Sequence, residues 1–121
     1  MVHFVGAGPG DKELITVKGK RLLEEADVII YAGSLVNPEL LEYGRPEAEI
    51  YNSASMTLDE VIAVMEKAEA TVKTTVRLHT GDPSIYGAHR DQMDRLEEKH
   101  IAYDVVPGVS SFQAAAASLK K

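Results

Sequence analysis

The sequence predicts an α/β fold, a five-stranded parallel sheet with helices on both faces. Short apolar runs alternate with longer stretches of helical periodicity, as they do when helices connect parallel strands. The segment 27–31 is a nearly continuous apolar run, which is typical of a strand buried on both faces. No internal repeat, low-complexity segment or Gly/Ser-rich linker interrupts the 121 residues, so we expect one domain over 1–119, with 120–121 as a tail.

The strands and helices are expected in strict alternation along the chain. Strands are predicted at about 2–5, 27–31, 48–51, 74–79 and 102–106. Helices are predicted at about 13–26, 37–43, from 57 onward, 86–98 and 110–119.

Capping residues and apolar spacing identify the individual helices. Asn37 is suited to cap the second helix, with Pro38 at its first position, and Thr57 and Glu60 have the spacing of a capping box. No glycine stands between Lys67 and Thr74, although glycine is favoured just past a helix end. An amphipathic surface at helical spacing is expected in the first helix at Leu14, Val17, Arg21, Leu22 and Glu25. The apolar face of the third helix is expected at Leu58, Val61, Ile62, Met65 and Ala68, and Met93 and Leu96 support the fourth helix.

Composition excludes several classes of function. Thirteen basic and nineteen acidic residues give a net charge of -6 without a basic stripe, so we expect no nucleic-acid partner. The apolar runs are too short to cross a membrane, and because a strand is predicted from residue 2 we expect no signal peptide. The absence of cysteine fits a cytoplasmic protein. The four histidines, His3, His79, His89 and His100, lack the spacing of metal ligands, so no metal site is expected.

The turn after the first strand, Gly6–Asp11, is the most distinctive local feature. Glycines at 6, 8 and 10 allow a ligand to approach the backbone, while Pro9 lacks an N–H and suits the wall of a site. A dinucleotide fingerprint would need its third glycine one position later and a carboxylate after the second strand; a P-loop would need Gly-Lys-Ser/Thr. Nucleotide binding is therefore not favoured, and an ordinary strand-to-helix turn remains the alternative.

Five such turns are expected at one edge of the sheet, because all parallel strands end there and ligands bind there. Four of the five contain glycine, which lets a ligand lie against the backbone. These turns are Gly6–Asp11, Ala32–Val36, Asn52–Met56, Thr80–Gly87 and Pro107–Ser111.

The chain resembles the tetrapyrrole (corrin and sirohaem) methyltransferases that use S-adenosylmethionine. The matching blocks are Val5–Asp11, Leu14–Gly19, Ala26–Tyr31, Gly81–Gly87 and Val106–Ser111, and their order and spacing fit over essentially 1–119. Within that family, Tyr31–Val36 and Arg77–Pro83 look like the subgroup that methylates C-11 of precorrin-4 or cobalt-precorrin-4 in cobalamin biosynthesis.

The resemblance implies a three-layer, flavodoxin-like sandwich with S-adenosylmethionine at the carboxyl edge and a tetrapyrrole, precorrin-4 or cobalt-precorrin-4, above it. The methyl group would pass in line from sulfur to a ring carbon, a reaction in which positioning supplies most of the catalysis. By resemblance, the donor would contact Pro9, Thr80, Gly81, Asp82, Ile85, Ser110 and Ser111. The tetrapyrrole would contact Gly8, Gly10 and Ser34, and Asp82 and Asp11 are the candidate catalytic carboxylates, although each could instead cap a helix.

The chain also departs from this family. Its members are about twice as long and have two domains, so we expect this chain to be an N-terminal half that lacks the second domain and is inactive alone. The family implies a homodimer, whereas the half would be a monomer or a weak dimer. The alternative is an excised or redesigned non-catalytic flavodoxin-like module; methylation of RNA is disfavoured by the acidic balance.

Overall fold

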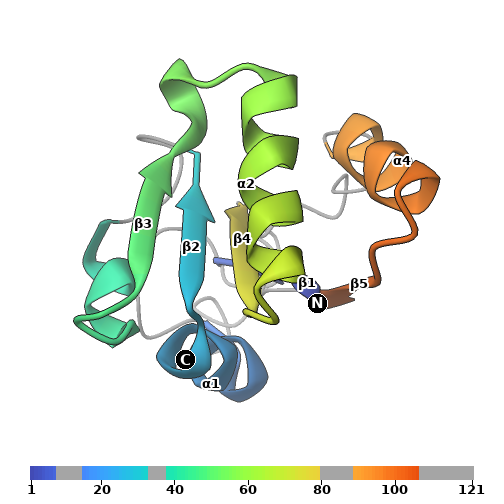
Figure 1. Cartoon of the computed structure of the whole chain (residues 1–121). Coiled ribbons are helices and arrows are strands. Elements are labelled where there is room, and N and C mark those ends of the chain that lie inside the picture. The colour runs from blue at the N-terminus through green and yellow to red at the C-terminus, as the bar shows by residue number, and fades with distance from the viewer. Residues whose placement is uncertain (8–14, 33–37, 80–88, 107–121) are drawn as a thin grey trace, which may run out of the picture.

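The computed structural model describes residues 1–7, 15–32, 38–79 and 89–106. Five strands form one parallel sheet: β1 (Val2–Gly6), β2 (Val28–Tyr31), β3 (Glu49–Asn52), β4 (Thr75–His79) and β5 (Tyr103–Val106). Their order across the sheet is β3-β2-β4-β1-β5, with β4 at the centre and β2 and β1 on either side of it (Figure 1). The predicted α/β class and all five strands are confirmed. This order differs from the 2-1-3-4-5 order of flavodoxin, although both have three layers.

Helices cover the two faces of the sheet and enclose a separate core on each. The three α-helices are α1 (Val17–Glu25), α2 (Leu58–Ala70) and α4 (Arg90–Glu98), and the 3-10 helices are η3 (Pro38–Tyr43) and η4 (Ser53–Ser55). On one face, α2 and α4 pack on Phe4 and Ile30; on the other, α1 and η3 pack on Val5, Ile29 and Leu78. Figure 1 shows α2 lying across β2 and β4 and α4 beyond the β5 side of the sheet. The helix predicted at 110–119 lies outside the described residues.

The capping box predicted at the start of α2 is confirmed. Thr57 Oγ1 accepts a hydrogen bond from Glu60 N–H at 3.2 Å, and Glu60 Oε1 accepts one from Thr57 N–H at 3.1 Å. The predicted inward residues of α2 and α4 are also confirmed, with Leu58 only partly buried. Among the described residues, no helix is long and apolar enough to cross a membrane.

The amphipathic surface predicted for the first helix is not the face that packs on the sheet. α1 buries Gly19 and Leu23, whereas Val17 is 85% exposed. Thr16 caps α1 by accepting a hydrogen bond from Gly19 N–H, and the helix then lies so close to β1 that a Cβ on Gly19 would be 3.0 Å from Val5 Cγ1. Because of this close approach, positions 19 and 23 of α1 face the sheet. Arg21 and Glu25 therefore face solvent, and Leu22 is partly buried. Leu14 lies outside the described residues.

Two helices end in left-handed residues that are not glycine. Val72 has φ 56° and follows α2, and His100 has φ 59° and follows α4. In α2, Val72 N–H donates to Glu69 O at 3.1 Å and Lys73 N–H donates to Ala68 O at 2.8 Å. These are the two bonds of a Schellman motif, in which glycine normally takes the position of Val72. The glycine that the sequence lacks here is therefore replaced by a β-branched residue in the same conformation.

Candidate functional site

The centre of the carboxyl edge, between β1 and β4, is a topological switch point. The chain leaves β1 for α1, which packs on one face, and leaves β4 for α4, which packs on the other. Such a divergence opens a crevice between adjacent strand ends, which is where open α/β sheets bind ligands. Ala7 N–H donates to His79 O at 2.7 Å, so the two strand ends are held together just before they diverge. The two turns with the strongest glycine patterns, after β1 and after β4, therefore start side by side.

The residues that the resemblance assigns to ligands follow the ends of β1, β2, β4 and β5 and lie outside the described residues: Gly8, Pro9, Gly10, Asp11, Ser34, Thr80, Gly81, Asp82, Ile85, Ser110 and Ser111. The structure describes the strand ends before them. Gly6 pairs with His79 in the sheet, and Val5 pairs with Val106 on its other side. The first, fourth and fifth turns thus begin from three adjacent strands. Next to them, Ser53 Oγ donates to Tyr31 O at 3.0 Å and joins the end of β2 to η4.

A buried polar cluster lies at the end of β4, on the face of the sheet that α4 covers. Of its members, only Arg77 and His79 fall within one of the sequence blocks on which the family resemblance rests. We call it the β4–α4 cluster: Arg77 and His79 of β4, His89 at the start of α4, and Gln92 of α4. Both β4 residues are 4% exposed, and the His79 and His89 rings lie 5.6 Å apart. The Phe4 ring of β1 packs against the His89 ring, with their centroids 5.9 Å apart.

Hydrogen bonds in this cluster fix the orientation of the Gln92 amide and the tautomer of His89. Arg77 Nε–H can only donate, and it lies 3.2 Å from Gln92 Oε1, so that oxygen is the acceptor. The Gln92 Nε2 group must then donate to His89 Nδ1, 3.2 Å away. Neutral His89 therefore carries its proton on Nε2.

Burial lowers the pKa values of His89 and Arg77 in this cluster, and neighbouring cationic groups lower that of His89 further. Desolvation, followed by the charges of Arg77 and His79, lowers the pKa of His89 to about 4. Desolvation also lowers the pKa of Arg77 to about 10, so its guanidinium stays charged at neutral pH. Among the described residues, no carboxylate forms an ion pair with Arg77; its partners are Gln92 Oε1 and, at 3.4 Å, Leu78 O. A lone arginine within the apolar run of β4 is the sequence signal that could have revealed this cluster.

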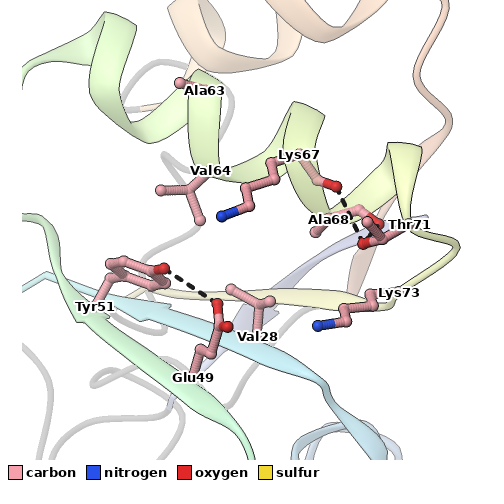
Figure 2. Close-up of a pocket in the computed structure, with 9 residues that line it drawn as sticks. All are labelled: Val28, Glu49, Tyr51, Ala63, Val64, Lys67, Ala68, Thr71 and Lys73. Carbon is pink, nitrogen blue, oxygen red and sulfur yellow. Dashed lines mark hydrogen bonds between the residues drawn. The ribbon is translucent and has the colours of Figure 1, made fainter.

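A groove of about 260 Å³ lies at the opposite edge of the sheet, between α2 and the starts of β2 and β3 (Figure 2). Its floor includes Val28, and the Lys67 and Lys73 side chains extend along it. On its β3 wall, Tyr51 Oη donates to Glu49 Oε2 at 3.1 Å. Because it lies at the amino ends of the strands, this groove is separate from the switch point. In the part of the chain that the structure describes, no three His, Cys, Asp or Glu side chains come together as a metal site would require.

The sequence and the fold both match known methyltransferases. The family model of tetrapyrrole (corrin/porphyrin) methylases matches residues 1–121. A cobalt-precorrin-4 C(11)-methyltransferase of Methanocaldococcus jannaschii is 65% identical over 119 residues, which are 98% of this chain and 46% of that protein. A precorrin-4 C(11)-methyltransferase of a Sinorhizobium species is 52% identical over 118 residues, 98% of this chain and 47% of that protein.

Solved structures give the same result for the fold. The cobalt precorrin-4 methyltransferase CbiF superimposes with a TM-score of 0.91 at 45% identity, over 98% of this chain and 50% of CbiF. A uroporphyrin-III C-methyl transferase from Thermus thermophilus, solved with S-adenosyl homocysteine, superimposes with a TM-score of 0.76 at 34% identity, over 95% of this chain and 47% of that one. The chain spans about half the length of these relatives. With a family model that matches its whole length and a fold shared with solved members, the chain belongs to the tetrapyrrole (corrin/porphyrin) methylase family.

Proposed function

We propose that this chain is the N-terminal half of an S-adenosylmethionine-dependent methyltransferase that methylates C-11 of precorrin-4 or cobalt-precorrin-4 in cobalamin biosynthesis. The observation that carries the proposal is the 65% identity, over nearly the whole chain, to a relative named for the cobalt-precorrin-4 reaction. The switch point between β1 and β4 supports it, because the turns that would hold donor and tetrapyrrole start there.

In this proposal the residues of the chain act mainly by positioning. Pro9 and the segments Thr80–Ile85 and Ser110–Ser111 would hold the methyl donor, while Gly8, Gly10 and Ser34 would leave room for the tetrapyrrole. A ring carbon then attacks the sulfonium methyl in line, and correct alignment contributes most of the rate enhancement. Asp82 and Asp11 are the carboxylates proposed to orient polar groups or accept a proton. No metal ion is required of the protein itself.

The longer protein would include the half that the relatives have beyond the matched region, and we propose that this second domain closes the donor site. It would function in the cytoplasm, as suits a cysteine-free chain, and as a homodimer, as the resemblance implies. Burial of most of a small ligand is what gives such sites their affinity, so one half alone would bind weakly.

A complementation assay tests this function directly. A chimera would join residues 1–121 to the second half of the M. jannaschii relative, and the separate halves would serve as controls. Incubation with S-adenosylmethionine and precorrin-4, or its cobalt complex, should add one methyl group detectable by mass spectrometry, whereas uroporphyrinogen III should remain unmodified. A folded chimera that binds no S-adenosylhomocysteine and methylates neither precorrin would instead favour a non-catalytic module. Transfer to uroporphyrinogen III alone would exclude the proposed substrate.

A further inference from the structure

The β4–α4 cluster joins the two elements on either side of residues 80–88. Arg77 and His79 stand at the end of β4, and His89 and Gln92 stand at the start of α4. The connection between them runs through side chains: Arg77 Nε to Gln92 Oε1 at 3.2 Å, and Gln92 Nε2 to His89 Nδ1 at 3.2 Å. Nothing in the proposed chemistry uses these residues, yet they carry a charged group that is 4% exposed.

The burial of Arg77 is costly, which argues for a role that apolar residues could not fill. Among the described residues Arg77 has no ion pair, and its two hydrogen bonds to neutral oxygens there only partly replace the hydration that its buried guanidinium loses. An apolar residue would pack against α4 without that cost, but it could not hold Gln92 in one orientation. Buried polar contacts of this kind select one arrangement of the packed elements, because a shift of α4 along the sheet would break them.

We propose that Arg77, Gln92 and His89 form a positioning network that fixes α4 relative to the end of β4, and thereby places the donor-binding segment that these elements flank. This inference rests on the proposed function, since it assumes that Thr80–Ile85 contacts the methyl donor. Gln92 is the central member, because among the described residues it bonds both to Arg77 of β4 and to His89 at the start of α4. None of the three residues needs to touch the donor.

The first test replaces Gln92 in the chimera. Gln92→Leu keeps much of the volume but removes both hydrogen bonds, and should weaken S-adenosylhomocysteine binding about tenfold or more, because small misplacements of positioning groups are costly. Gln92→Glu keeps an acceptor for Arg77 Nε–H and should remain within about threefold of the parent affinity, as a charge-assisted bond replaces the neutral one. Titration calorimetry gives both affinities.

Two matched controls separate positioning from stability. Ile101→Val removes one buried methylene group near the far end of α4, lowering the thermal midpoint without altering the network. Glu98→Gln changes an exposed residue of α4. Both should leave the affinity within about twofold, since neither breaks a contact of Gln92.

The outcomes distinguish this inference from the proposed function. If the parent chimera binds no S-adenosylhomocysteine, the proposed function fails, and this inference fails with it. If the parent binds and folded Gln92→Leu binds equally well, only the positioning network is wrong. A loss of affinity in Ile101→Val as large as that in Gln92→Leu would also overturn it, since stability alone would then explain the effect. A second readout is the His89 tautomer, measured by nitrogen NMR. The ring proton should be on Nε2 in the parent and on Nδ1 in Gln92→Glu, because the carboxylate can only accept a hydrogen bond.

Discussion

The Asp27 carboxylate bridges the starts of two neighbouring strands. Its Oδ2 accepts a hydrogen bond from Thr74 N–H at 2.9 Å, just before β4, and its Oδ1 accepts one from Arg45 at 2.5 Å. The bond from the Thr74 backbone is the main reason that the pKa of Asp27 is lowered, with Arg45 contributing further and desolvation opposing. Asp27, which the sequence analysis placed within the second strand, thus holds the starts of β2 and β4 together at the amino edge of the sheet.

Asp27→Asn should therefore destabilise the chain. We expect a loss of about 1 kcal/mol at pH 7, since the amide replaces a charged acceptor in a partly exposed site. Because the folded pKa lies below the unfolded value near 3.8, this contribution is present above pH 4 and is lost as the pH falls through the folded pKa. Urea unfolding at pH 7 and pH 3 measures both effects. Glu24→Gln, an exposed change in α1 outside its first turn, is the control, and an equal loss in both variants would contradict the bridge.

Val72→Gly should stabilise the protein. The left-handed conformation of Val72 costs a β-branched residue about 1 kcal/mol or more relative to glycine, and its 94% exposed side chain contributes little packing in return. We expect a net gain of about 0.5–1 kcal/mol, after subtracting the greater freedom of glycine in the unfolded chain. Val72→Ala tests the cause, because alanine keeps the Cβ and should gain less. Equal or lower stability of Val72→Gly in chemical denaturation would disprove the strain.

The stability of the fold should depend on His89 in mildly acidic solution. The folded pKa near 4 lies below the unfolded value of 6.5, so the unfolded chain binds more protons between these values. The free energy of unfolding therefore decreases as the pH falls from about 6.5 toward 4. In the folded chain, protonation of His89 would place a second positive charge in a buried site beside Arg77 and His79. His89→Gln should flatten the dependence over this window. Identical slopes in parent and variant, measured by urea unfolding across the window, would show that His89 does not titrate as described.

The isolated chain should bind the methyl donor far more weakly than the chimera. Loss of two or three buried hydrogen bonds at about 1 kcal/mol each, together with lost apolar burial, would reduce affinity by orders of magnitude. Calorimetric titration of both proteins with S-adenosylhomocysteine measures the difference. Near-equal affinities would mean that the second half contributes nothing to the donor site.

The sequence predicted the sheet and most helix faces well because local signals agreed with tertiary packing. The apolar run of β2 and the Thr57–Glu60 capping box each specify one outcome, and both occur in the structure. The face of α1 was predicted wrongly because its rotation is set by the approach of Gly19 to Val5, a contact between elements that periodicity cannot reveal. The β4–α4 cluster was missed for the same reason: Arg77 and Gln92 meet only after α4 docks on the sheet. The roles of Pro9 and Asp82 came from the resemblance and remain predictions.

The interior position of β1, between β4 and β5, has a consequence for synthesis on the ribosome. Val2 pairs with Thr75 on one side and with Tyr103 on the other, so β1, which is made before the other four strands of the sheet, has no neighbour until β4 has emerged. β2 and β3, in contrast, can pair with each other early. Contacts between residues far apart in the sequence form slowly. Until β4 and β5 are made, the apolar segment of β1 therefore has unpaired backbone groups that are exposed to other chains. Translation to the end of β5 is thus the earliest point at which β1 can have a paired strand on each side.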